Sequence, residues 1–447
     1  MTGATLAQSA THQNEALLFL TLLQLVIIVI MGRVGGELAT RVSQSRAVGE
    51  IVIGILLGPS LFGLLAPDMF QYVFKSSSPQ PMFILSQIGL VLLMFQIGLE
   101  FDFSHLTAHA NRRAVLRIAA AGIVFPFGLG FAFGYYTAPL LSPQADHLAS
   151  GLFVATAFCI TALPVLGRIM MEFDMARTRL GVIGISVAAI TDVVSWLLLA
   201  VVTAVSLSGF SLGRFAQTLG LLALYIAVCW LVIRPALHRA VKHSVVTEHR
   251  FSDNLLGLLI ATIFLSAMAT YRIGIFAIFG GFMMGVLLHD QHEVVRAWRK
   301  KAGEFVSVFF LPIFFTYTGL RTDIGALDRW ELWGWCALLI ALATIGKLGG
   351  CYLAARWSGM NHQESKIIGI MMNTRALMEL IIINVGFDIG VISQNVFTML
   401  VLMAIFSTVI TAPALRRWLP GVGVSVKMHR WPGESGDVVL RVKTDIE

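Results

Sequence analysis

Long apolar segments recur along the whole chain and are separated by short polar loops. Their residues do not alternate between apolar and polar, as strands of a membrane β-barrel would, so the segments predict transmembrane α-helices of about 20 residues each. The pattern predicts thirteen spans, of which the ninth is short and rich in glycine. In chain order the predicted spans cover residues 16–35, 46–64, 82–100, 114–137, 148–171, 178–206, 212–237, 253–271, 274–289, 303–320, 332–355, 365–387 and 394–418.

Composition agrees with a polytopic membrane protein. The chain is 57% hydrophobic and only 13% charged, whereas a soluble protein carries about 25% charged residues. The net charge of +7 does not indicate a nucleic-acid partner, because most basic residues lie in loops between spans. The cysteines are far apart in apolar runs without metal-ligand or disulfide spacing, which predicts small core residues. They are Cys159, Cys229, Cys336 and Cys351.

The loops differ in charge between the two sides of the predicted bundle. Most of the 32 Lys and Arg residues fall on the side of the C-terminus, which the positive-inside rule places in the cytoplasm. With an odd number of spans the N-terminus lies outside, so residues 1–15 form an external or periplasmic tail and residues 419–447 a short cytoplasmic tail. We therefore expect a multi-pass protein of the cell (inner) membrane. The basic loop residues of the other side are Lys75, Arg214, Arg272, Arg321 and Arg329.

Two short matches indicate an internal repeat. The segment Gly98–Asp102 closes the third span, and the similar segment Gly319–Asp323 closes the tenth. In both matches the second segment lies seven spans after the first. Because seven is an odd number, the second copy is inverted in the membrane, as in many secondary transporters. The second match pairs two glycines of the second span with two of the ninth, namely Gly54 and Gly58 with Gly281 and Gly285.

The repeat predicts the domain organisation. We expect an all-α polytopic membrane protein with two inverted repeats of six spans joined by a linker helix. Under this pairing the fifth span corresponds to the twelfth. The predicted units are a transmembrane domain at 16–418, with repeat one at 16–206, the linker at 212–237 and repeat two at 253–418.

Asp192 is the only charged residue in the apolar run from about Leu180 to Ser206. An acid at that depth costs about 2.5–3.5 kcal/mol on insertion scales, so it tends to face a water-filled cavity or a partner. One alternative is an Asp that only pairs with a basic residue. The functional hypothesis is that the Asp192 carboxylate binds a proton or a small cation, which the protein moves between two sides of a membrane.

The fifth span carries Pro164 in its middle, three residues after Thr161. Proline removes a backbone hydrogen bond and breaks or kinks a helix. The freed carbonyls and the Thr161 hydroxyl can line a cavity and help to coordinate a cation. The alternative is an ordinary kink with a threonine bonded to its own helix.

Three further charged residues within predicted spans bear on the site. Arg375 and Glu379 are four residues apart on the twelfth span, hence on one helix face, and one interpretation is that they pair only with each other. Lys347 lies in the middle of the eleventh span among glycines that let another helix approach closely. Lys347 needs an acid, either Asp192 or Glu379. It forms a structural salt bridge or competes with the cation for the carboxylate.

These segments resemble the monovalent cation:proton antiporter family, in its second large branch, which includes bacterial sodium or potassium/proton exchangers and plant cation/proton exchangers. The resemblance extends over about residues 45 to 390. The matching motifs are Gly54–Ser60, Gly98–Asp102, Thr161–Pro164, Thr191–Asp192, Lys347 and Asn373–Leu380.

The resemblance implies a dimerisation domain and a mobile core domain that moves like an elevator, usually in a homodimer. Spans five and twelve would be discontinuous helices that cross near the ion site. Asp192 would bind Na⁺ or K⁺ and the proton in turn, with oxygens from Thr161 and Thr191. The crossed-helix residues and charge partners would be Pro164, Asn373, Thr374, Arg375, Glu379 and Lys347.

The chain departs from many electrogenic relatives, which have two adjacent acids where it has Thr191 and Asp192. With one titratable carboxylate, exchange of one cation for one proton is electroneutral, although a proton coupled through Lys347 would restore charge movement. No nucleophile elbow, phosphate loop or zinc motif indicates an enzyme, and no cofactor is expected. The alternatives are a sodium-coupled organic anion transporter, with Arg375 and Lys347 binding the anion, and a gated channel or non-transporting sensor.

Overall fold

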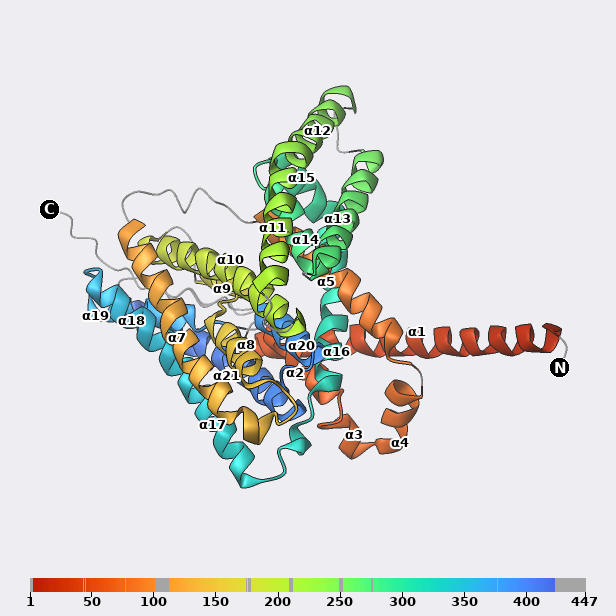
Figure 1. Cartoon of the computed structure of the whole chain (residues 1–447), viewed down its shortest axis with the longest axis horizontal. Coiled ribbons are helices and arrows are strands. Elements are labelled where there is room, and N and C mark those ends of the chain that lie inside the picture. The colour runs from red at the N-terminus through yellow and green to blue at the C-terminus, as the bar shows by residue number, and fades with distance from the viewer. Residues whose placement is uncertain are drawn as a thin grey trace, which may run out of the picture.

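The computed structural model describes residues 3–42, 44, 46–76, 78–100, 112–173, 175, 178–208, 212–248, 252–274, 276–375 and 377–422. Every regular element in these ranges is a helix (Figure 1), which confirms the all-α prediction. Eight described helices are long and apolar enough to cross a membrane, or up to ten when two bent pairs each count as one span. The count of thirteen and the domain boundaries therefore stay predictions.

One group of helices, called the scaffold group below, contains the first three predicted spans and spans eight to ten. Its members pack on one another through α1 with α2, α2 and α5 with α16, and α5 and α13 with α14. Short helices α3 (Phe62–Leu65), α4 (Pro67–Phe70) and α15 (His292–Trp298) flank it. The group comprises α1 (Gly3–Arg41), α2 (Arg46–Leu56), α5 (Gln80–Glu100), α13 (Asp253–Ile273), α14 (Ala277–Leu288) and α16 (Leu311–Arg321).

A second group, called the core group, contains spans four to six and eleven to thirteen, and Figure 1 shows it beside the scaffold group. Helices α11 (Leu212–Val228) and α12 (Arg234–Glu248) link the two halves of the chain and pack on α13 and α14. The core group comprises α7 (Arg112–Leu141), α8 (His147–Cys159), α9 (Leu163–Glu172), α10 (Arg179–Ser208), α17 (Trp330–Thr344), α18 (Gly350–Trp357), α19 (His362–Met372), α20 (Leu377–Asp388) and α21 (Gln394–Trp418).

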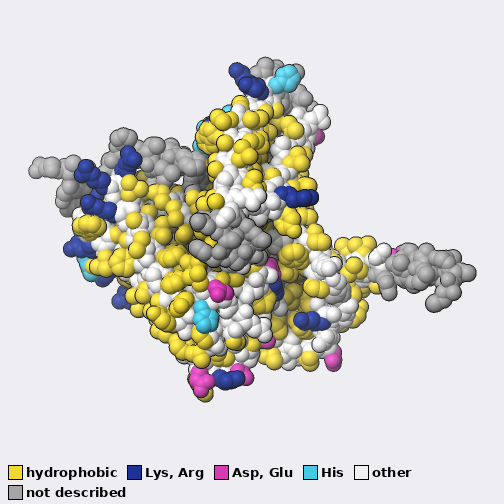
Figure 2. All heavy atoms as spheres, viewed as in Figure 1, with side chains coloured by type: hydrophobic (Ala, Val, Ile, Leu, Met, Phe, Trp, Pro, Cys, Tyr) yellow, Lys and Arg dark blue, Asp and Glu magenta, His cyan; other side chains and the backbone are white. Residues whose placement is uncertain are grey.

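The termini lie partly outside these groups. Helix α1 begins at Gly3 and so includes most of the segment expected to be a tail, and its N-terminal part extends beyond the other helices (Figure 1). After α21 the structure describes only the short turn Leu419–Val422, so the rest of the expected cytoplasmic tail lies outside the described residues. Figure 2 shows hydrophobic side chains over most of one face and basic side chains gathered near the end of α12 and near α18 and α19.

Two close helix contacts, each made by a pair of glycines, agree with the predicted inverted repeat. A Cβ added to Gly58, two residues after the end of α2, would lie 2.4 Å from the carbonyl oxygen of Gly319 on α16. A Cβ added to Gly285 on α14 would lie 2.8 Å from the carbonyl carbon of Gly98 on α5. The sequence repeat equates Gly58 with Gly285 and Gly98 with Gly319, so the same close contact is made twice with the repeats exchanged. Such backbone approach needs residues without a side chain.

The fifth and twelfth predicted spans are both broken, as expected. Residues 160–162 separate α8 from α9, and α19 and α20 meet at a bend of 43° around residues 373–376. Pro164 is the second residue of α9 rather than the centre of a kink. At that position its missing N–H removes no intrahelical bond, because the first helical amides have no partner. The side chain of Pro164 lies outside the described residues.

Candidate functional site

The two broken spans contact each other at their breaks. The backbone N–H of Ala162 donates to the carbonyl of Thr374 at 2.9 Å. The hydroxyl of Thr161 donates to the carbonyl of Met372 at 3.3 Å. Thr161, Ala162 and Thr374 are all fully buried. The crossed discontinuous helices are thus present, and each break supplies a hydrogen-bond partner to the other.

Two buried cations cover the C-terminal end of α8. Arg375 donates to the carbonyls of Ala157 and Phe158, each at 3.0 Å. The Lys347 ammonium donates to the carbonyl of Cys159 and, at 2.9 Å, to that of Gly122 on α7. The last carbonyls of a helix have no intrahelical donors and carry its negative partial charge. The two side chains therefore stabilise a helix end that lies inside the protein.

Glu379 balances one of these cations. Its carboxylate accepts a hydrogen bond from Arg375 at 2.9 Å, and neither side chain is exposed. Glu379 lies in the first turn of α20, where the helix dipole favours a negative charge. Arg375 and Glu379 therefore pair with each other in the structure, and Arg375 also binds backbone carbonyls.

The environment of Lys347 differs from the one that the sequence predicted. Within the described ranges it forms no ion pair with Asp192 or Glu379, and its hydrogen bonds go to backbone carbonyls instead. The physical reason is that a broken helix offers partial negative charges at its end, which can hold an ammonium group without an acid.

Asp192 lies on α10, which packs against α8, α9 and α19. Its side chain is 3% exposed, and neither carboxylate oxygen has a hydrogen-bond partner of good geometry among the described residues, although the backbone N–H of Leu163 at the start of α9 is close to the carboxylate. Burying an unpaired carboxylate is costly unless it is neutralised by a proton or a cation. Asp192 is thus the buried acid beside the crossing that no described side chain neutralises.

Other buried oxygens around the crossing also lack partners within the described part of the chain. They are the amide oxygen of Asn373 and the hydroxyl oxygens of Thr374 and Ser195, and the amide nitrogen of Asn373 has no partner either. The Thr191 hydroxyl donates to the carbonyl of Ala188 at 3.0 Å, which leaves its oxygen lone pairs able to accept or coordinate. Carboxylate, amide and hydroxyl oxygens suit hard cations.

The sequence analysis did not single out Ser195. Its position three residues after Asp192 places both side chains on one helix face, and this spacing was an available signal. No group of three or more His, Cys, Asp or Glu side chains in the described ranges could hold a metal ion. The site therefore combines one acid with neutral oxygens.

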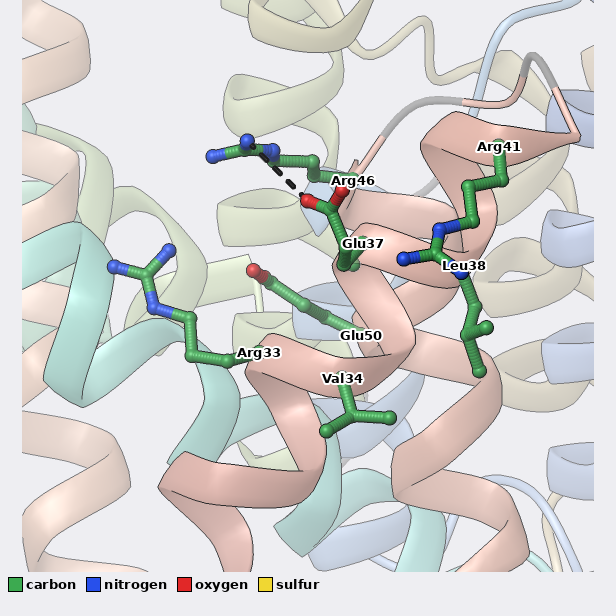
Figure 3. Close-up of a pocket in the computed structure, with 8 residues that line it drawn as sticks. Arg33, Val34, Glu37, Leu38, Arg41, Arg46 and Glu50 are labelled. Carbon is green, nitrogen blue, oxygen red and sulfur yellow. Dashed lines mark ion pairs between the residues drawn. The ribbon is translucent and has the colours of Figure 1, made fainter.

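A separate cavity of about 560 Å³ lies between α1 and α2 (Figure 3). Within it Arg46 and Glu37 form an ion pair at 3.8 Å, and Glu50 is buried although the sequence analysis overlooked it. None of its lining residues belongs to the crossed helices, so the candidate ion site is inferred from the unpartnered oxygens instead. The lining residues are Arg33, Val34, Gly36, Glu37, Leu38, Arg41, Arg46 and Glu50.

Comparisons with known proteins cover nearly the whole chain. The model of a family described as sodium/hydrogen exchanger, transmembrane, matches residues 25–419. The Na(+)/H(+) antiporter NhaS4 of Synechocystis is 37% identical over 405 residues, which are 90% of this chain and 98% of that protein. Cation/H(+) antiporter 17 of Arabidopsis thaliana is 34% identical over 91% of this chain.

The length of the match differs between relatives. The chain spans 49% of the Arabidopsis protein and 43% of K(+)/H(+) antiporter 1 of Saccharomyces cerevisiae, to which it is 28% identical. Among solved structures, the sodium proton antiporter MjNhaP1 from Methanocaldococcus jannaschii aligns with a TM-score of 0.62. That alignment covers 92% of this chain and 99% of the archaeal one at 14% identity, so it shows a shared fold.

Proposed function

The chain belongs to the sodium/hydrogen exchanger transmembrane family, and from this membership we propose that it exchanges Na⁺ or K⁺ for H⁺ at the carboxylate of Asp192. It is a cation/proton antiporter, hence a transporter rather than an enzyme. The choice of ion, the coupling ratio and the motion that carries the ion are parts of the proposal.

The observation that carries the proposal is the contrast between the two buried acids of the core group. Arg375 binds one oxygen of Glu379 and balances its charge, whereas both oxygens of Asp192 lack a partner among the described residues. A proton and a cation can therefore compete for Asp192 alone. Competition at one carboxylate couples the two fluxes, because a core with a bare buried charge crosses the membrane much less readily than a neutralised one.

The neutral oxygens near Asp192 would replace part of the hydration of the cation. Thr161, Thr191, Asn373 and Thr374 all lie at the crossing or beside the acid, and Ser195 adds a fifth oxygen. Cavity size and the number of oxygens in contact would decide between Na⁺ and K⁺.

An elevator motion is supported by the division into two groups of helices. All the site residues belong to the core group, while the scaffold group contributes none of them. A rigid movement of the core group would carry the site across the membrane without rebuilding it. We further propose that the scaffold group forms the homodimer, that the C-terminus is cytoplasmic because of the Lys and Arg distribution, and that the protein resides in the cell (inner) membrane.

Electroneutral exchange is supported by the contacts of Lys347. Its Nζ donates to two backbone carbonyls, at the end of α8 and on α7, so it serves the packing of the core. Asp192 then remains as the one carboxylate free to alternate between ligands. Lys347 binds backbone carbonyls, and the terminal nitrogens of Arg375 bind backbone carbonyls and Glu379. Because these donors already have acceptors inside the protein, their contacts argue against an organic anion as the substrate.

The test uses purified protein in proteoliposomes that contain a pH-sensitive dye. External Na⁺, K⁺ or Li⁺ should drive proton movement, with the same rate when valinomycin and K⁺ set the membrane voltage. Asp192→Asn should abolish the response, whereas Asp328→Asn, an exposed acid with 70% of its side chain accessible, should not. Exchange that persists in Asp192→Asn would refute the assignment.

One further variant tests the coupling ratio in the same vesicles. Thr191→Asp adds a second titratable group beside Asp192, so exchange should become sensitive to the membrane voltage. A rate that stays independent of voltage in an active Thr191→Asp protein would contradict the proposed link between carboxylate number and charge movement.

A further inference from the structure

The end of α16 joins the scaffold group to the core group through a charged network. Arg321, the last residue of α16, donates to Oδ1 of Asn384 at 2.9 Å and to a carboxylate oxygen of Asp388, both on α20. Its guanidinium also lies 4.7 Å from the ring centre of Phe387 and 5.1 Å from that of Tyr317. The Arg321 side chain is 19% exposed and that of Asp388 is 33% exposed, so the pair is partly shielded from water.

Neutral hydrogen bonds extend this network along the same contact. The amide nitrogen of Asn384 donates to the hydroxyl of Thr318 on α16 at 2.8 Å. The carboxamide of Gln394, at the start of α21, donates to the last carbonyl of α16. The hydroxyl of Thr398 on α21 donates to the carbonyl of Asp323 at 3.3 Å. Each bond joins α16, or the residues directly after it, to α20 or α21, so a large displacement of the core group away from α16 would break the network.

The network lies at the end of the membrane domain where α21 begins, opposite to the end where α21 stops at Trp418. Thr318 and Thr398 are fully buried there, which means that the two groups are sealed against each other at this end. Under the proposed orientation this is the external side. Alternating access requires such a seal to open once in each cycle.

We propose that Arg321 is the external gate residue of the transporter: its bonds to Asn384 and Asp388 hold the core group in the conformation closed to the outside, and they break when the site opens outward. Arg321 does not touch the transported cation and acts on the conformational equilibrium alone. The inference rests on the proposed function, because it assigns the gate to the elevator motion of that same site.

Removal of contacts that exist in one conformation only shifts the equilibrium towards the other. Hydrogen bonds to charged groups are each worth about a factor of ten or more in an equilibrium constant. Arg321→Gln removes the ion pair with Asp388 and weakens the bond to Asn384. The population that is open to the outside should therefore rise by about tenfold or more.

The experiment measures the accessibility of a reporter thiol in the seal. Thr398→Cys places a small thiol at a buried position of α21, and the four native cysteines are all buried and serve as the background. A membrane-impermeant thiol reagent is added to one side of the membrane at a time. With Arg321 present the external reagent should label the reporter slowly, and with Arg321→Gln about tenfold faster.

The matched control is Arg329→Gln, since Arg329 belongs to the loop that follows the same helix but has 74% of its side chain exposed. It should leave the labelling rate unchanged. The exchange of charges in Arg321→Asp with Asp388→Arg should slow labelling again, which a role in local folding would not predict. If Arg321→Gln does not fold, Asp388→Asn removes the same ion pair from the other side.

A labelling rate within about twofold of the parent in both Arg321→Gln and Asp388→Asn would overturn the gate. So would rapid external labelling with Arg321 and Asp388 both intact. The readout needs no transport and is thus separate from the test of Asp192. If Asp192→Asn still exchanges ions while Arg321→Gln opens the seal, the ion site is wrong and the gate stands.

Discussion

The Arg375–Glu379 pair allows a quantitative test of how the broken helix α8 is stabilised. Arg375→Met removes the partner of a fully buried carboxylate, and breaking a buried pair in this way costs about 3–5 kcal/mol. It also leaves the carbonyl of Phe158 without its donor, at about 1–3 kcal/mol, and leaves the carbonyl of Ala157 only the long 3.5 Å bond from the N–H of Ile160. Arg375 thus contributes through two separate effects.

The double variant Arg375→Met with Glu379→Gln separates these effects. It removes the unpaired carboxylate and so recovers the first contribution, but the carbonyls of Ala157 and Phe158 still lack the hydrogen bonds from Arg375. We therefore expect the double variant to be more stable than Arg375→Met alone and less stable than the parent. Arg329→Met, at an exposed arginine, serves as the control and should leave stability unchanged.

The assay is the midpoint of thermal unfolding in detergent, followed by tryptophan fluorescence at a single heating rate. Because such unfolding is often irreversible, the order of the midpoints is the relevant result. A double variant as stable as the parent would refute the reasoning. Arg375 would then serve only to neutralise Glu379, and the C-terminal end of α8 would need no donor from it.

Two further predictions concern other parts of the chain. Gly58→Ala should destabilise the protein by about 1–3 kcal/mol through overpacking against α16, whereas Gly257→Ala, where an added Cβ meets nothing within 4 Å, should not, and equal thermal midpoints would contradict this. Outside the spans, partial burial acts to raise the pKa of Asp290, but the hydrogen bond from Arg234 and nearby positive charges outweigh it and hold the pKa below its usual value. The folded pKa is below the unfolded one, so the stabilisation is present above about pH 4 and is lost as the pH falls through the folded pKa; Asp290→Asn should remove this part of the acid dependence in a thermal titration.

Several features of the fold were predictable because they depend on the order of residues alone. The length of an apolar run decides whether a helix can cross a bilayer, and an isolated charge such as Asp192 is visible in that run without any coordinates. The glycine matches at Gly58 and Gly285 predicted the inverted repeat because close backbone contact imposes the same requirement in both copies. The number of spans did not follow with the same certainty, since α2 and α14 are short and α8–α9 is broken.

The partners of the buried charges could not be read from the sequence. Lys347 was expected to need an acid, but it binds carbonyls of Cys159 and Gly122, which become available only because α8 ends inside the protein. The sequence also does not show that the side-chain amide of Asn373 has no hydrogen-bond partner within the described residues, whereas the carboxylate of Glu379 has one. Such differences depend on which helix ends and side chains meet in space.

By itself, then, the sequence determined that the chain is an inverted-repeat bundle of membrane helices with a carboxylate at its centre, because hydrophobicity and glycine spacing are local properties. Only the tertiary structure decided which buried charges neutralise one another and which have no partner among the described residues. It alone also brought Arg321 to Asp388, which are 67 residues apart in the chain. Hydrogen bonds are short and directional, so their partners are chosen by the packing of helices and not by their order.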